Sequence, residues 1–130
     1  MLPVEYFPGR EAYPVEAKDW VAALEEKLTE LGKTYKIVWV AKPAAFDWPW
    51  IKCYYEMFKS ANAPDIGFKA HCISTMVWAY CASHGIEDSR PLEVKLTKGV
   101  AEKHSHDALE DAREQADLFM GIAELLGMKL

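Results

Sequence analysis

The amino-acid sequence predicts one α/β domain that covers residues 1–130. Three observations indicate this class: a helical spacing of apolar residues near the N-terminus, a continuous β-branched and aromatic run at residues 35–41, and a long helical spacing at the C-terminus. Alternating helices and buried strands are typical of a sheet that helices cover. With 51% hydrophobic residues among 130, the chain is long enough to bury a core of its own.

The N-terminal third of the chain predicts irregular structure, one helix and one strand. Residues 1–14 contain three prolines and a glycine, which favour irregular chain or an edge strand. Apolar residues then recur every three or four positions over residues 15–31, and Gly32 follows where the end of a helix favours glycine. The run 35–41 predicts a strand that is buried on both faces.

The middle of the chain predicts a second helix and a short strand. We expect the helix over residues 48–59, with Asp47 as its N-cap and Pro49 in its first turn. A loop rich in turn-forming residues follows at 62–67. Residues 68–73 are expected to form a short strand.

The C-terminal half predicts two further helices with a strand between them. Ser74 or Thr75 is expected to cap a helix that runs to Ser83. A strand is expected at residues 92–96. Apolar residues at spacings of three and four predict the last helix over residues 107–126.

Charge and cysteine usage narrow the class of protein. A formal net charge of −5 disfavours broad electrostatic binding to a nucleic-acid backbone, but it is compatible with an enzyme that grips one strand end through bound metal ions. The three cysteines form no C-x-x-C pair, which predicts reduced thiols in a cytoplasmic protein. Cys72, Cys81 and His84 lack an evident fourth ligand for zinc. We expect no signal peptide and no membrane span, because neither pattern occurs in the sequence.

Two acidic residues stand where the predicted fold concentrates reactive groups. Asp47 follows the buried strand, and Asp111 lies near the start of the last helix. In open α/β sheets, reactive groups gather at strand ends and helix starts. Carboxylates at two such places suit Mg²⁺ or Mn²⁺, and a pair of these ions is able to activate a water against a phosphodiester. A histidine suits the removal of that water's proton near neutral pH, and His106 stands just before the helix.

These residues also resemble a known family. Phe46-Asp47 resembles the second motif of the DEDDh-type 3′–5′ exonucleases, which share the ribonuclease H-like fold. The segment His106-x-Ala108-x-x-Asp111 resembles their third motif, H-x-A-x-x-D. The separation of the two aspartates and the order of the predicted elements are also similar. The resemblance implies that Asp47 and Asp111 are ligands in a two-metal site for Mg²⁺ or Mn²⁺ and that His106 is the general base. It also implies that the substrate is the 3′ end of a single-stranded nucleic acid.

Two aromatic residues are the candidate substrate-binding side chains. Phe46 and Trp48 stand on either side of Asp47. An aromatic ring beside a metal ligand is able to stack on a base, although large aromatics at helical spacing are more often part of a core. Trp48 and Trp50 flank Pro49, and of these two Trp48 is the stronger candidate for stacking because it follows Asp47 directly.

One part of the family pattern is missing from the sequence. The first motif of the family is a D-x-E on its first strand, and no D-x-E occurs among the 46 residues before Asp47. We therefore expect a ribonuclease H-like fold that lacks the first strands of its sheet. The chain is then a fragment, or a partner chain supplies the missing motif, or the protein is inactive. A truncated sheet also leaves an edge that a homodimer would bury.

Each candidate residue has a purely structural interpretation as well. Asp47 is a suitable N-cap, and Asp111 belongs to an acidic helix start that the helix dipole favours. His106 lies in a polar segment that is typical of a surface loop. Two alternatives to an exonuclease therefore stay open: a non-catalytic exonuclease-like module for protein binding or dimerisation, and a helical binding protein whose motif matches are accidental. The sequence does not distinguish RNA from DNA as the substrate.

Overall fold

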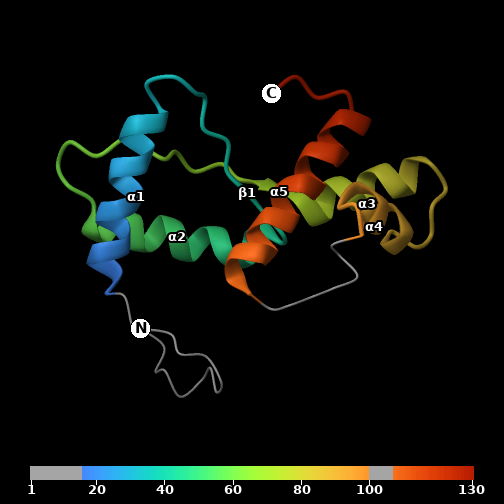
Figure 1. Cartoon of the computed structure of the whole chain (residues 1–130), viewed down its shortest axis with the longest axis horizontal. Coiled ribbons are helices and arrows are strands. Elements are labelled where there is room, and N and C mark those ends of the chain that lie inside the picture. The colour runs from blue at the N-terminus through green and yellow to red at the C-terminus, as the bar shows by residue number, and fades with distance from the viewer. Residues whose placement is uncertain (1–15, 100–106) are drawn as a thin grey trace, which may run out of the picture. The chain divides into compact units, whose positions relative to one another are not determined.

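The computed structural model describes residues 16–99 and 107–130 (Figure 1). Along the chain, the described elements follow the order helix, strand, helix, strand and three helices. They belong to two compact units: the first contains residues 16–37 and 49–68, and the second contains residues 38–48, 69–99 and 107–130. The single domain that the sequence predicts stays a prediction.

The first unit is built on α1 (Ala17–Leu31) and on most of α2 (Ala44–Phe58). α1 is the predicted N-terminal helix. Its last turn is closed by a hydrogen bond of 2.9 Å from the backbone N–H of Gly32 to the carbonyl of Leu28. Four hydrophobic residues in the described part of this unit are buried: Val21, Leu28, Tyr55 and Ile66. The Tyr55 hydroxyl donates to the carbonyl of Pro64 at 2.7 Å, which satisfies the polar atom of a fully buried ring.

The second unit contains a small parallel sheet. β1 (Val40–Ala41) pairs with β2 (His71–Cys72), with Val40 opposite His71 and Ala41 opposite Cys72. α2 begins shortly after β1, and α3 (Ile73–Ser83) begins directly after β2. Because the carboxyl ends of parallel strands meet at the same edge of a sheet, the first turns of α2 and α3 both start at this edge.

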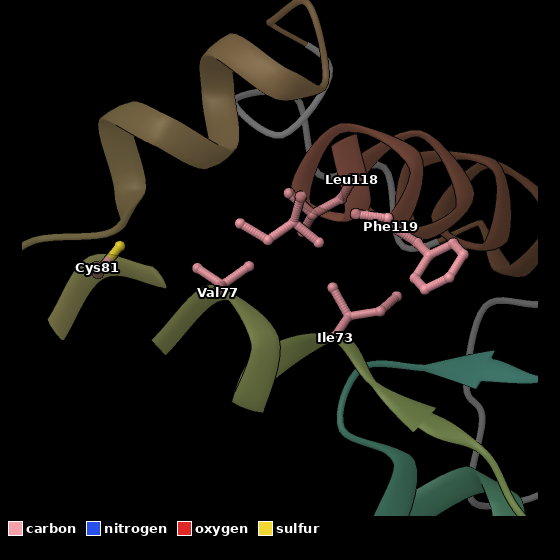
Figure 2. Close-up of a cluster of buried hydrophobic side chains, with 7 residues drawn as sticks. Ile73, Val77, Cys81, Leu118 and Phe119 are labelled. Atoms are coloured by element: carbon pink, nitrogen blue, oxygen red, sulfur yellow. The ribbon is translucent and has the colours of Figure 1, made fainter. Parts of the chain in front are cut away.

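The core of the second unit lies between helices. α3 and α4 (Arg90–Leu96) both pack against α5 (Ala108–Leu125), which also contacts β1. Figure 2 shows Ile73 and Val77 pointing from α3 toward α5. The buried cluster consists of Ile73, Val77, Cys81, Leu118, Phe119, Ile122 and Ala123. Burial of each large apolar side chain contributes about 1.5–3 kcal/mol, so this cluster is the main source of stability for the packing of α3 on α5.

α2 starts earlier than the sequence predicts, and the expected boundary at Trp48 is wrong. The helix begins at Ala44, directly after Pro43, whose carbonyl accepts a backbone hydrogen bond from three residues further on. Asp47 therefore lies in the first turn instead of at the N-cap, and Pro49 lies inside the helix. The turn that ends β1 starts the helix, and this turn precedes the Asp-Trp-Pro pattern on which the prediction depended.

The predicted strands are too long, and one of them is a helix. Within residues 35–41 only the last two residues pair, and Tyr35 is exposed, so the expected burial on both faces is wrong. The parallel pairing with β2 covers only two residues of each strand. Residues 92–96, predicted as a strand, belong to α4, where Pro91 occupies a position near the helix start that suits the fixed φ of proline.

The remaining helix and strand boundaries agree more closely with those predicted from the sequence. The strand expected at 68–73 is reduced to β2, and the N-cap of α3 is Cys72 instead of Ser74 or Thr75. The last helix is confirmed: α5 begins after Asp107, and its C-terminal end is followed by Gly127 with a φ of 67°.

The described part of the chain is thus mostly helical, with one two-stranded parallel sheet. The ribonuclease H-like fold that the resemblance implies stays a prediction. In the described ranges, no helix has both the length and the apolar character needed to cross a membrane.

Candidate functional site

Asp47 lies in the first turn of α2, and its side chain is exposed. The turn after β1 determines this position, because α2 starts directly after that turn, three residues before Asp47. A carboxylate in the first turn is stabilised by the positive end of the helix dipole, typically by about 0.3–1 kcal/mol. The same position leaves its oxygens open to solvent and therefore accessible to a cation.

The two candidate substrate-binding residues beside Asp47 differ in exposure. Phe46 is 70% exposed, so its ring is available to a ligand. Trp48 is half-buried, and its ring centroid lies 5.1 Å from that of Trp39 at an interplanar angle of 41°. The stacking role expected for Trp48 stays a prediction, but Phe46 is the more accessible of the two rings.

Asp111 lies in the first turn of α5 and is half-buried. The N-cap of this helix is Asp107, whose carboxylate accepts hydrogen bonds from the backbone N–H groups of Leu109 and Glu110 at 3.0 and 3.1 Å. Because Asp107 caps the helix, the carboxylate of Asp111 is not needed for capping. Asp111 thus lies near the start of the last helix, as the sequence predicts.

Asp47 and Asp111 belong to the same compact unit, and each lies in the first turn of a helix. The helix that carries Asp111 contacts β1, the strand that leads into the helix of Asp47. His106, the third candidate residue, lies outside the described residues. That the two carboxylates serve one site stays a prediction.

The carboxyl end of β1 is tied to α4 by an ion pair that the sequence does not reveal. The ammonium group of Lys42 donates to a carboxylate oxygen of Glu93. The hydroxyl of Ser89 donates to the other carboxylate oxygen at 3.1 Å. The side chain of Glu93 is only 16% exposed, so this pair is partly shielded from water. The ion pair holds Lys42 in the turn before α2, the helix that carries Asp47.

The carboxyl end of β2 carries a thiol in a polar environment. The pKa of the Cys72 thiol is lowered, first by a hydrogen bond with the Thr75 side chain and then by one from the backbone of Ala44, and burial opposes this by raising it. Ala44 is the first residue of α2, so the sulfur lies beside the first turns of both α2 and α3. No sequence signal of the C-x-x-C type points to this residue.

The described residues 16–99 and 107–130 contain no group of three or more His, Cys, Asp or Glu side chains placed to hold a metal ion. Two aspartates without further protein ligands suit Mg²⁺ or Mn²⁺ only in part, because these ions take several oxygen ligands. Cys72, Cys81 and His84, the spacing considered for zinc, do not form such a group, and Cys81 is buried in the core. The two-metal centre therefore stays a prediction.

No protein-family model, no curated protein and no solved structure matches the chain.

Proposed function

We propose that this chain contributes half of a metal-dependent 3′–5′ exonuclease site that acts on the ends of single-stranded RNA or DNA. One observation carries the proposal: Asp47 and Asp111, the aspartates of the two motif-like segments, lie in helix first turns of the same compact unit. The spacing His106-x-Ala108-x-x-Asp111 supports it from the sequence. This chain would supply two carboxylates and a histidine to the site.

Each residue has a chemical role in this proposal. The oxygens of Asp47 and Asp111 would hold Mg²⁺ or Mn²⁺, which when bound lowers the pKa of a water and stabilises the leaving oxygen of the phosphodiester. His106 would take the proton of the attacking water. Phe46, exposed beside Asp47, would pack on the terminal base.

Two carboxylates leave the site incomplete. A two-metal centre needs further oxygen ligands, and no D-x-E precedes Asp47 in the sequence. The missing carboxylates would come from a further segment of the same polypeptide or from a partner chain, which includes a second copy. A non-catalytic module with an exonuclease-like scaffold is the second candidate, and the absence of a three-ligand group in the described residues favours it.

Paramagnetic broadening by Mn²⁺ tests whether the two aspartates share a cation. In ¹⁵N-labelled protein, substoichiometric Mn²⁺ should broaden the backbone amide signals of Asp47 and Asp111 together. Asp47→Asn and Asp111→Asn should each abolish the broadening at both places. Asp19→Asn is the matched control, because Asp19 also lies in the first turn of a helix but in the other unit. It should leave the broadening unchanged.

A cleavage assay with a 5′-labelled single-stranded oligonucleotide completes the test. The half-site predicts Mn²⁺ binding by the chain without release of nucleotides until the missing carboxylates are supplied. When they are supplied, His106→Ala should abolish cleavage without changing the fold. If about 1 mM Mn²⁺ broadens neither aspartate, the exonuclease proposal is wrong and the non-catalytic module is favoured.

A further inference from the structure

The second unit contains a pocket of about 360 Å³ on the face of α3 that is turned toward the start of α4. This volume lies in the range of small-molecule sites, which are apolar with a few polar groups that orient the ligand. The pocket is lined by Lys42, Ser74, Val77, Trp78, Cys81, Ala82, Ile86, Glu87, Ser89 and Glu93. All of these residues belong to the second unit.

The pocket combines an apolar floor with one exposed aromatic wall. Val77 and Cys81 are buried members of the core and form the floor. Their side chains leave α3 on the same side in Figure 2. Trp78, next to Val77, is 70% exposed and has no aromatic partner in the described part of the chain. An exposed indole beside an apolar floor offers a planar surface on which a flat ring is able to stack.

The polar groups of the pocket divide into paired and unpaired ones. Lys42, Ser89 and Glu93 satisfy one another through the ion pair and the hydroxyl hydrogen bond. Glu87, on the loop between α3 and α4, has no hydrogen-bond or ion-pair partner among the described residues. A ligand in the pocket would therefore meet the free carboxylate of Glu87, which only accepts hydrogen bonds, and the hydroxyl of Ser74, which donates or accepts.

We propose that this pocket binds a nucleobase, with guanine preferred. The inference rests on the proposed function, since a strand end brings a base to this unit. Trp78 would stack on the base, and the two oxygens of Glu87 would accept two N–H groups from one edge. Guanine carries two adjacent N–H donors on its Watson–Crick edge. Adenine, cytosine and uracil each place a hydrogen-bond acceptor beside the donor on that edge, and this acceptor would face the carboxylate.

The position of the pocket agrees with this role. Lys42 lines the pocket and lies in the turn from which α2 begins, and Asp47 lies in the first turn of that helix. The pocket and the candidate metal ligand therefore border the same short segment of the second unit. A nucleotide with its base in the pocket would have its phosphate close to this segment.

The test is a titration of the purified chain with guanosine 5′-monophosphate in metal-free buffer, followed through the indole N–H signal of Trp78. We expect a dissociation constant on the order of 1 mM. Adenosine, cytidine and uridine 5′-monophosphates should bind at least about fivefold more weakly, because each leaves a carboxylate oxygen facing an acceptor. Trp78→Ala should weaken binding about tenfold. Because this variant lacks the indole signal, its binding is measured by saturation transfer to the ligand.

Two variants with matched controls separate stacking from hydrogen bonding. Trp50→Ala removes a tryptophan of similar exposure, 62%, from the other unit and should leave the binding unchanged. Glu87→Gln should abolish the preference for guanosine over adenosine monophosphate, and Glu124→Gln, on α5, should preserve it. Equal binding of the four nucleotides, or binding that Trp78→Ala does not weaken, would overturn the proposal.

The outcome is separable from that of the exonuclease proposal, because the titration contains no metal. Guanosine monophosphate binding at Trp78 without Mn²⁺ binding at Asp47 would leave the pocket valid and refute the exonuclease site. Mn²⁺ binding at Asp47 without nucleotide binding at Trp78 would refute the pocket alone.

Discussion

The ammonium group of Lys42 and the carboxylate of Glu93 form an ion pair across 51 residues of sequence. Lys42 follows β1, and Glu93 lies in α4. The side chains are 30% and 16% exposed, so water screens the pair less than it screens a surface pair. Because α4 packs on α5, the ion pair joins the turn before α2 to the helical core.

Glu93→Ala should lower the free energy of unfolding by about 2 kcal/mol, because it leaves the half-buried ammonium group of Lys42 without its partner. Urea denaturation followed by circular dichroism measures this change. Glu124→Ala, on the exposed surface of α5 in the same unit, is the control and should change stability by about 0.5 kcal/mol or less. Equal effects of the two substitutions would show that the ion pair adds nothing to the stability.

Gly121→Ala should destabilise the protein by about 1 kcal/mol, although alanine is the better helix former. A Cβ at position 121 would lie 2.8 Å from Cδ2 and 3.1 Å from Cβ of Leu96, so the Leu96 side chain would have to turn and its Cβ to move away by a few tenths of an ångström. Thermal unfolding provides the measurement. In a Leu96→Ala background, the same substitution should cost less, because Cγ and Cδ2 of Leu96 are gone and only the 3.1 Å contact with Cβ remains. A stabilising Gly121→Ala in the otherwise unchanged protein would contradict the close approach of α4 and α5.

Tyr55→Phe should lower the free energy of unfolding by about 1 kcal/mol at pH 7, since it removes the hydrogen bond to Pro64. Burial raises the pKa of Tyr55 above its ordinary value of about 10. The folded state therefore favours the protonated hydroxyl. Its contribution is complete below the unfolded pKa and is lost as the pH rises through the folded pKa.

Chemical denaturation at several pH values between about 9 and 11.5 tests this sign. The difference in stability between the wild type and Tyr55→Phe should shrink as the pH rises above about 10. Tyr54→Phe, one residue earlier on the same helix and with a less buried ring, is the control. A difference that stays constant over this range would exclude the proposed coupling between Tyr55 ionisation and folding.

Part of this fold could be predicted from the sequence, because its signals are local. α1 and α5 were expected because apolar residues keep a helical spacing over many turns, and Gly32 and Gly127 follow these helices. The residues of α4 alternate in character over only a few positions, a pattern that a strand shares. There the deciding signal is Pro91 at the helix start, not the apolar run.

The candidate site, too, is only partly predictable from the sequence. The first-turn position of Asp111 agrees with the sequence prediction, because it depends on the local pattern of the last helix. The first-turn position of Asp47 differs from the predicted N-cap, because α2 starts earlier, at Ala44. The contact of Lys42 with Glu93 joins segments far apart in the chain, and no local sequence pattern predicts it. The length of β1 was not predictable for the same reason, since a strand ends where its partner ends.

The thiol of Cys72 should titrate below the ordinary cysteine value of about 8.5, because the hydrogen bond with the Thr75 side chain stabilises its thiolate. Alkylation of Cys72 by iodoacetamide, measured over pH 5–10 by mass spectrometry of the labelled peptide, gives the midpoint. Thr75→Val should raise the midpoint, and Thr75→Ser, which keeps the hydroxyl, should preserve it.

The lowered pKa of Cys72 also determines how the stability of the fold changes with pH. The thiolate stabilises the fold above the unfolded pKa, and this contribution is lost as the pH falls through the folded pKa. The wild type should therefore gain stability relative to Cys72→Ser as the pH rises from about 6 to about 9. Thr75→Val should flatten this difference, because its thiolate lacks the hydroxyl donor. A midpoint that Thr75→Val leaves unchanged would show that the side chain of Thr75 is not what stabilises the thiolate.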